Sequence, residues 1–356
     1  MLGNPLVWAA IASATMASLG SGQGTPARLT QFLEQTIELN RDDMGAAATG
    51  KPVVKVLATS DQREVAVFGI VSVNVPRSFY VRSVSDFSKS LRTPSRPRPR
   101  FGIFSDPVAV ADVAALSVPH DDVQDLARCR PGACKVKLSA AAIARLQGSL
   151  DPNSPSADSV ASAYFRARMM DYITGYRARG NTALIVYDDQ RAAAAAADVF
   201  NGILSRSPYM YQYAPSLERY LKDYPADRPA DVSEVLFWSE DDFPSLKPTI
   251  TITHEIVYAP PELPGSTLIV AKQLYADHYF DGALDLTAVV DQASDSAHTP
   301  GIFLVLLHRL HFDDLPSGGL MNVRGKVIGK VRDETMTFLR DVKRRSEQAY
   351  ASAPGN

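Results

Sequence analysis

The last third of the chain contains four strand-like runs in a row, and this pattern constrains the fold more than any other part of the sequence. The runs TITITHEIVYA, TLIVAKQLYADHYF, ALDLTAVVD and GIFLVLLHRLHF are rich in β-branched and aromatic residues and partly alternate. They are separated by PPELPG, by Asp281-Gly282 and by the polar QASDSAHTP, all of which favour turns. Because successive strands with short connections usually pair antiparallel, we expect an antiparallel sheet.

A long amphipathic helix is predicted directly after these strands. In KVIGKVRDETMTFLRDVKRRSEQAY, apolar side chains recur at helical spacing, so one stripe of the helix must be buried, and the adjacent sheet is the natural partner. The fold class predicted is therefore α+β. The expected stripe consists of Val327, Ile328, Val331, Thr335, Phe338, Leu339 and Val342.

The rest of the chain predicts two further strands and several helices. TPARLTQFLEQTIELNRDD has helical periodicity, EVAVFGIVSVN alternates like a strand, and RSFYVRSVSDF is typical of a short helix. KVKLS then predicts a strand, and SAAAIARL predicts a helix that begins at a serine cap. Three more helices are expected at 159–179, 191–204 and 216–222, the second of them on a run of alanines, which are strong helix formers.

The order of these elements resembles the START-like superfamily, in which an antiparallel sheet wraps around a long C-terminal helix, the helix-grip fold. VSVNVPRSFY resembles that family's strand running into its first helix, and the resemblance covers about residues 65–90 and 235–350. It implies one domain over 25–350 with a large, mainly helical insertion at about 91–230, followed by a short tail at 351–356. It also implies a space between sheet and helix that holds a lipid, sterol, polyketide or other apolar ligand.

Of the four histidines in the strand-like runs, His254, His278 and His308 are predicted by alternation to point to the apolar side of their strands, so that these three can point into one interior. Neutral imidazoles there can bind zinc, act as a general base or hydrogen-bond the polar end of a ligand, and each can equally be a satisfied core residue. There is no H-x-x-x-H pair, Gly-rich phosphate loop or G-x-S-x-G elbow, so we assign no catalytic residue, metal or cofactor. The predicted ligand-binding residues are His254, Tyr258, His278, Phe280, Leu306 and His308.

These observations predict a protein that binds or transports an apolar small molecule in an internal pocket. An enzyme of cyclase or hydrolase type that uses the pocket histidines, with or without a metal, is the alternative, and a structural or interaction protein is the second. The tyrosine-rich SPYMYQYAPSLERYLKDYP can line a ligand mouth, contact a membrane transiently or simply pack between helix and loop. With 37 Lys and Arg against 39 Asp and Glu, the net charge of −2 argues against a nucleic-acid partner.

The N-terminal 24 residues resemble a signal peptide, so we expect a periplasmic or secreted protein. The apolar run from Pro5 to about Ala17 is shorter than the roughly 20 residues of a membrane span and is followed by small residues. No Lys or Arg precedes it, which leaves a disordered tail as the alternative. Cys129 and Cys134 flank the turn in CRPGAC, and we expect a disulfide there, with two free buried thiols of a cytosolic protein as the alternative.

Overall fold

The structure is a computed structural model that describes residues 26–85, 100–241, 246–293, 301–316 and 322–353. The signal-peptide prediction falls on residues 1–24 and so lies outside the described residues. Within the described ranges, no helix is both long and apolar enough to cross a membrane.

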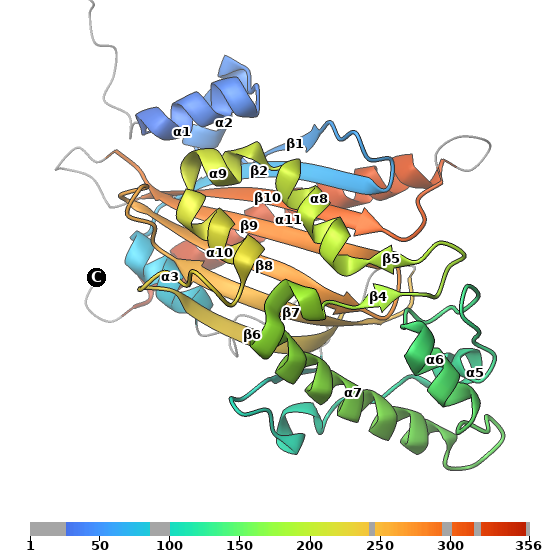
Figure 1. The fold of residues 1–356 in the computed structure, drawn as a ribbon. Coiled ribbons are helices and arrows are strands. Elements are labelled where there is room, and N and C mark those ends of the chain that lie inside the picture. Colours follow the sequence, from blue (N-terminus) through green and yellow to red (C-terminus); the bar gives the residue numbers. More distant parts are fainter. Residues whose placement is uncertain (1–25, 86–99, 242–245, 294–300, 317–321, 354–356) are drawn as a thin grey trace, which may run out of the picture.

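An eight-stranded antiparallel sheet forms the centre of the molecule (Figure 1). The four strand-like runs are its strands β7 to β10, and the predicted strand near the N-terminus is β2, which pairs with β10. The sequence pattern did not single out β6, which joins β7 to the short edge strand β3. In sheet order, the strands are β1 (Val53–Leu57), β2 (Glu64–Val73), β10 (Ile302–Phe312), β9 (Phe280–Asp291), β8 (Ser266–Ala276), β7 (Thr249–Tyr258), β6 (Ser233–Asp241) and β3 (Phe101–Ile103).

Helices cover both faces of this sheet (Figure 1). The α11 face carries the C-terminal helix and α3, whereas the opposite face, here called the insertion face, carries α7 to α10 from the middle of the chain. The helices are α1 (Ala27–Gln31), α2 (Arg41–Ala48), α3 (Arg77–Ser85), α5 (His120–Leu126), α6 (Ala140–Gln147), α7 (Ala157–Arg179), α8 (Ala196–Ser205), α9 (Pro208–Tyr213), α10 (Pro215–Asp223) and α11 (Val323–Ala351). A π-helical turn, Phe32–Thr36, continues α1.

Helix α11 approaches the sheet closely at Gly69 of β2. A Cβ atom at this glycine would lie 3.0 Å from Leu339 Cδ1 and 3.1 Å from Thr335 Cγ2, so the missing side chain lets the helix approach. Thr335 and Leu339 are the buried members of the predicted stripe. Phe338, also assigned to the stripe, is 50% exposed, because the helix meets the sheet along a band narrower than the full apolar stripe.

Three local predictions were wrong. KVKLS forms no named strand, because its backbone makes only isolated hydrogen bonds, from Lys137 to Asp277 and from Asp188 to Leu138, and Lys137 Nζ pairs with Asp281 Oδ1, 2.8 Å away. The alanine run becomes helical only at Ala196, because the short strand β5 (Ala194–Ala195) pairs with β4 (Val186–Tyr187). The turn expected at Asp281-Gly282 lies earlier, since β8 ends at Ala276 and β9 already begins at Phe280.

Two local signals coincide with structural features. Ser139 accepts a hydrogen bond from the Ala142 backbone at the start of α6, as a capping residue does. Cys129 and Cys134 are disulfide-bonded, with Cα atoms 4.4 Å apart, and both side chains are buried.

Candidate ligand-binding site

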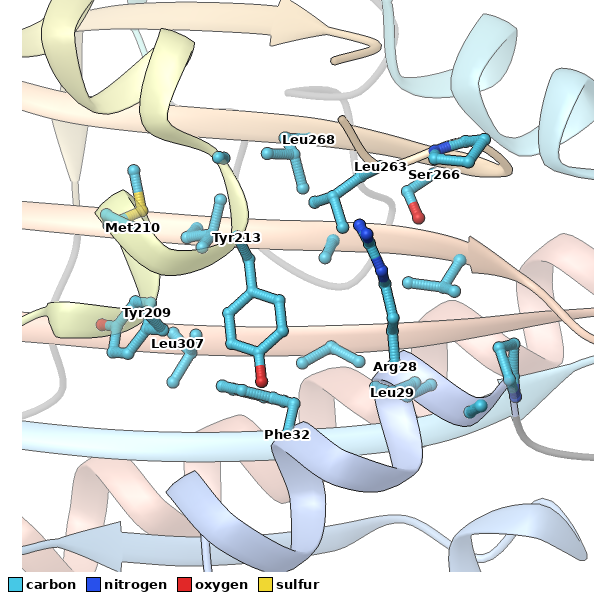
Figure 2. Close-up of a pocket in the computed structure, with 18 residues that line it drawn as sticks. Arg28, Leu29, Phe32, Tyr209, Met210, Tyr213, Leu263, Ser266, Leu268 and Leu307 are labelled. Atoms are coloured by element: carbon cyan, nitrogen blue, oxygen red, sulfur yellow. The ribbon is translucent and has the colours of Figure 1, made fainter. Parts of the chain in front are cut away.

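A cavity of about 310 Å³ lies on the insertion face of the sheet, under α1 and α9 (Figure 2). Its size falls at the lower end of the range typical of small-molecule pockets, roughly 300–1,000 Å³. Its walls are mainly aliphatic and aromatic side chains from five segments of the chain that are distant in sequence. Such a wall favours an apolar ligand.

The floor of the cavity is a patch of strands β8, β9 and β10. Leu268, Ala288 and Val305 form one row across these strands, with Ala288 in the middle. Because Ala288 has only a methyl group between two larger neighbours, the row is lowest at its centre, and the cavity lies above it. The floor residues are Ser266, Leu268, Leu286, Ala288, Val290, Val305 and Leu307.

The roof is held together by aromatic contacts. The Phe32 ring lies edge-on to Tyr209 and Tyr213, with ring centroids 6.2 and 5.7 Å away, and so ties the N-terminal segment to α9. Tyr209 and Tyr213 of the tyrosine-rich segment thus line the cavity and pack against the N-terminal segment. The remaining roof comes from Leu29, Met210, Ala214, Leu263 and Pro264.

Polar groups are few and lie mostly at one end of the cavity. Arg28 extends from α1 toward the β7–β8 turn, where its Nη1 donates a hydrogen bond to the carbonyl oxygen of Glu262 (Figure 2). Ser266 lies at the start of β8 in the same region and also lines the cavity. The Tyr209 hydroxyl is engaged elsewhere, since it donates to Ser207 Oγ at 3.1 Å and accepts from Arg309 Nε at 3.2 Å.

None of the six predicted ligand-binding residues lines this cavity. Tyr258 comes nearest, because it pairs with Leu268 and so continues the floor row onto β7. Its hydroxyl group lies 3.1 Å from Ser216 Oγ at the start of α10. Tyr258 therefore supports the edge of the site.

His254 is a core residue in a continuous chain of hydrogen bonds under α7. Its Nε2 lies 3.1 Å from Glu234 Oε2, and its Nδ1 lies 3.1 Å from the Tyr176 hydroxyl. A neutral imidazole that donates from Nε2 and accepts at Nδ1 satisfies both contacts. Burial, partly offset by Glu234, lowers the pKa of His254 below its usual value, in agreement with the neutral form.

The same chain of hydrogen bonds continues to a fully buried lysine. Lys272 Nζ lies 3.5 Å from the Tyr176 hydroxyl, donates to Asn181 Oδ1 and sits 3.8 Å above the centre of the Phe200 ring. No carboxylate of the described residues lies within ion-pair distance of this amine, and burial lowers the pKa of Lys272 well below its usual value. Through Tyr176, the chain of hydrogen bonds joins α7 to the sheet at His254 and Lys272.

His278 lies in the β8–β9 turn, not on a strand face as expected, because β8 ends two residues before it. Its Nδ1 is 3.1 Å from the Lys135 carbonyl oxygen and its Nε2 is 3.1 Å from Asp122 Oδ2. Both partners are acceptors, so the contacts require an imidazolium that donates from both nitrogens. Burial opposes the charge, but Asp122 and Asp277 raise the pKa of His278 above its usual value.

Asp122, Asp277 and His278 are residue types that bind metals, and their ligand atoms lie within 4.8 Å of one another. However, Lys247 Nζ already lies 2.6 Å from Asp122 Oδ1, and the His278 imidazolium faces the other oxygen. These two cations neutralise Asp122, whereas Asp277 accepts a hydrogen bond from the Ile250 backbone and burial raises its pKa to about 7. The group is therefore an ion-pair network that holds α5 to the β8–β9 turn.

His308, Leu306 and Phe280 all belong to the α11 face. Leu306 packs in the core beneath α11, and Phe280 packs beside Phe312, with ring centroids 4.9 Å apart. His308 Nδ1 lies 2.8 Å from Asp285 Oδ1, so its partner is a carboxylate. The expectation that the three histidines share one interior is wrong, because strand parity does not determine which face of the sheet each strand presents.

Glu255, Ala271, Asp285 and His308 form one row across β7, β8, β9 and β10 on the α11 face. The His308 and Asp285 side chains are 25% and 41% exposed, although they lie in the middle of the sheet. Burial raises the pKa of Glu255 to about 7. The pKa of His308 is also raised, since the effect of Asp285 exceeds that of burial.

Sequence reasoning missed most of the cavity. The floor residues are ordinary strand residues, and their common feature, the small Ala288 between larger neighbours, depends on a cross-strand register that the sequence does not reveal. The usable signals were the tyrosine-rich segment, which contributes Tyr209 and Tyr213, and Arg28 in an otherwise apolar helical pattern.

Comparisons with known proteins add little to this geometry. No family model and no curated protein matches the chain. Among solved structures, the Zhui aromatase/cyclase from Streptomyces sp. R1128 matches over 45% of this chain and 91% of its own, with 13% sequence identity and a TM-score of 0.23. A likeness this slight assigns no ligand, activity or shared site.

Proposed function

We propose that this protein binds an apolar small molecule in the cavity between α1, α9 and the insertion face of the sheet. The observation that carries the proposal is a partly open apolar cavity of about 310 Å³ with most of its few polar groups at one end. Core regions are normally packed without voids of this size, because an unfilled cavity loses dispersion contacts on every wall. A ligand that fills the cavity would restore those contacts.

The architecture agrees with a distant helix-grip relationship, since an antiparallel sheet is followed by a long C-terminal helix. The proposed site nevertheless differs from the one that the resemblance implied. It lies on the insertion face, where the helical insertion and the N-terminal segment supply its roof, and not between the sheet and α11. The disulfide between Cys129 and Cys134 supports the proposal of an exported protein.

A matched pair of alanine substitutions tests the location of the site. Ala288→Phe places a ring in the centre of the cavity floor, and Ala271→Phe places the same ring on the α11 face, at another partly buried strand alanine. We expect Ala288→Phe to weaken binding of the neutral fluorophore phenylnaphthylamine by at least about tenfold and Ala271→Phe to change it little. Loss of binding in Ala271→Phe alone would place the ligand under α11 instead.

The row of Glu255, Asp285 and His308 favours a second candidate function, acid–base chemistry on the α11 face. We propose it because an accessible His–Asp pair and a carboxyl group with a pKa of about 7 share one face, and groups that titrate near neutral pH suit proton transfer. Ala271, with only a methyl group, lies between Glu255 and Asp285 in this row.

NMR titration tests this second candidate. An apolar ketone bound above Ala271 should move the titration midpoints of both Glu255 and His308, and Ala271→Phe should abolish the change. If a saturating amount of the ketone leaves both midpoints unchanged, the α11 face is not an acid–base site.

A further inference from the structure

The charge of Arg28 is unmatched at the cavity. Its guanidinium group has five N–H donors, and its hydrogen bond within the described part of the chain goes to a neutral carbonyl oxygen, that of Glu262. No carboxylate of the described residues lies within 4.0 Å of it. The cavity therefore carries one positive charge at the β7–β8 turn.

The two acidic residues closest along this turn are already engaged. The Glu262 carboxylate accepts hydrogen bonds from Ser216 N, 3.2 Å away, and from the Ser216 hydroxyl at the start of α10. Asp291, at the end of β9, pairs with Arg77 at 3.0 Å. Neither residue neutralises Arg28.

The opposite end of the cavity offers no charge to a ligand. Met210 and Leu307 present only apolar atoms there, and Tyr209 presents its ring, because its hydroxyl group is hydrogen-bonded to Ser207 and Arg309. Figure 2 shows these side chains at the far side of the cavity from Arg28. Apart from the Tyr213 hydroxyl and Ser266, the rest of the lining is apolar, so the site carries a cation at one end and a mainly apolar wall elsewhere.

We infer that the ligand is a single-chain carboxylic acid, bound with its carboxylate toward Arg28 and Ser266 and its apolar chain over Ala288 toward Met210. This inference rests on the proposed function. A guanidinium group suits a carboxylate because two of its N–H donors match the two oxygens. The Ser266 hydroxyl can donate a third hydrogen bond from the edge of β8.

Calorimetric titration of the full-length chain with dodecanoate and with dodecanol tests the inference, since the two probes differ only in the head group. We expect the acid to bind about three- to tenfold more tightly, a modest preference because Arg28 is exposed and its interaction is screened by solvent. Arg28→Gln should abolish this preference and leave the affinity for dodecanol unchanged. Arg219→Gln, at an exposed arginine of α10 that does not line the cavity, should preserve the preference.

The possible outcomes separate the two claims. If both probes bind equally to the wild-type protein, or if Arg28→Gln retains the preference, the carboxylate assignment is overturned while the apolar site stands. If neither probe binds to the wild-type protein, the proposed function fails and the ligand class fails with it.

Discussion

His254 and His308 lie on opposite faces of the same sheet. Cross-strand partners point to the same face of a sheet, and the partners here are His254 with Lys272, Lys272 with Leu284, and Leu284 with Arg309. Arg309 therefore shares the face of His254, and it is the neighbour of His308 on β10. Adjacent residues of a strand point to opposite sides, so His308 projects away from His254. A single metal ion or ligand therefore cannot contact both imidazoles, and a three-histidine zinc site is excluded.

Lys272→Met is expected to raise the free energy of unfolding at pH 7 by about 1–3 kcal/mol. The substitution removes a buried amine that has no carboxylate of the described residues within ion-pair distance. Burial lowers the pKa of Lys272, so the unfolded chain binds a proton that the folded chain does not. Wild-type stability should then rise with pH toward pH 9, by up to about 1.4 kcal/mol per pH unit, and the advantage of the variant should shrink. Urea unfolding at several pH values measures both effects.

Lys137→Met is the matched control for that substitution. Lys137 is also buried, but its Nζ lies 2.8 Å from Asp281 Oδ1 and 3.6 Å from Asp189 Oδ2. Removing it leaves buried carboxylates without a cation, so we expect a loss of about 3–5 kcal/mol. If both substitutions changed the free energy of unfolding by the same amount and in the same direction, the carboxylate partners of Lys137 would make no difference to its contribution, and the prediction would be contradicted.

The secondary structure of the C-terminal part could be predicted because its signals are local. Alternation identified β7 to β10, and helical periodicity identified α11. The positions of the turns were less predictable: Asp281-Gly282 looked like a turn, yet Asp281 is buried by Lys137 from a distant segment. Likewise, the start of α8 is delayed because Ala194 and Ala195 pair with β4, a contact that alanine's helix propensity cannot anticipate.

His278→Gln is expected to lower stability by roughly 1–3 kcal/mol at pH 6, because it removes a buried charge-assisted hydrogen bond to Asp122. Since the folded pKa of His278 is raised, its contribution is fully present below the unfolded pKa of about 6.5 and is lost as the pH rises through the folded value. The stability gap between variant and wild type should therefore narrow above neutral pH. A gap that widens with pH would contradict an imidazolium at this position.

Glu255→Gln is expected to remove a different pH dependence. Burial raises the pKa of Glu255 to about 7, so between about pH 4.5 and 7 the folded chain holds a proton that the unfolded chain has lost. Wild-type stability should fall relative to the variant as the pH rises through this window. Carbon NMR titration of the Glu255 carboxyl gives the midpoint directly, and a midpoint near 4.5 would disprove the effect of burial.

The candidate site was less predictable than the fold, for a physical reason. A cavity is set by what faces what across strands and between distant helices, and Ala288 acquires its role only because Leu268 and Val305 flank it. The histidines were predicted to bind a ligand because imidazoles can donate and accept hydrogen bonds. In the structure, His254 and His278 form these hydrogen bonds with partners on α7 and α5, which are distant in sequence. Neither pairing has a sequence signal.

Native mass spectrometry of the protein purified from its own cells, followed by extraction and identification of what is released, tests the central claim most directly. We predict one apolar molecule per chain, carrying a carboxyl group, in the wild-type protein and in Ala271→Phe but absent from Ala288→Phe. A wild-type protein that is empty, or an Ala288→Phe variant that retains the same molecule, would contradict a ligand site on the insertion face.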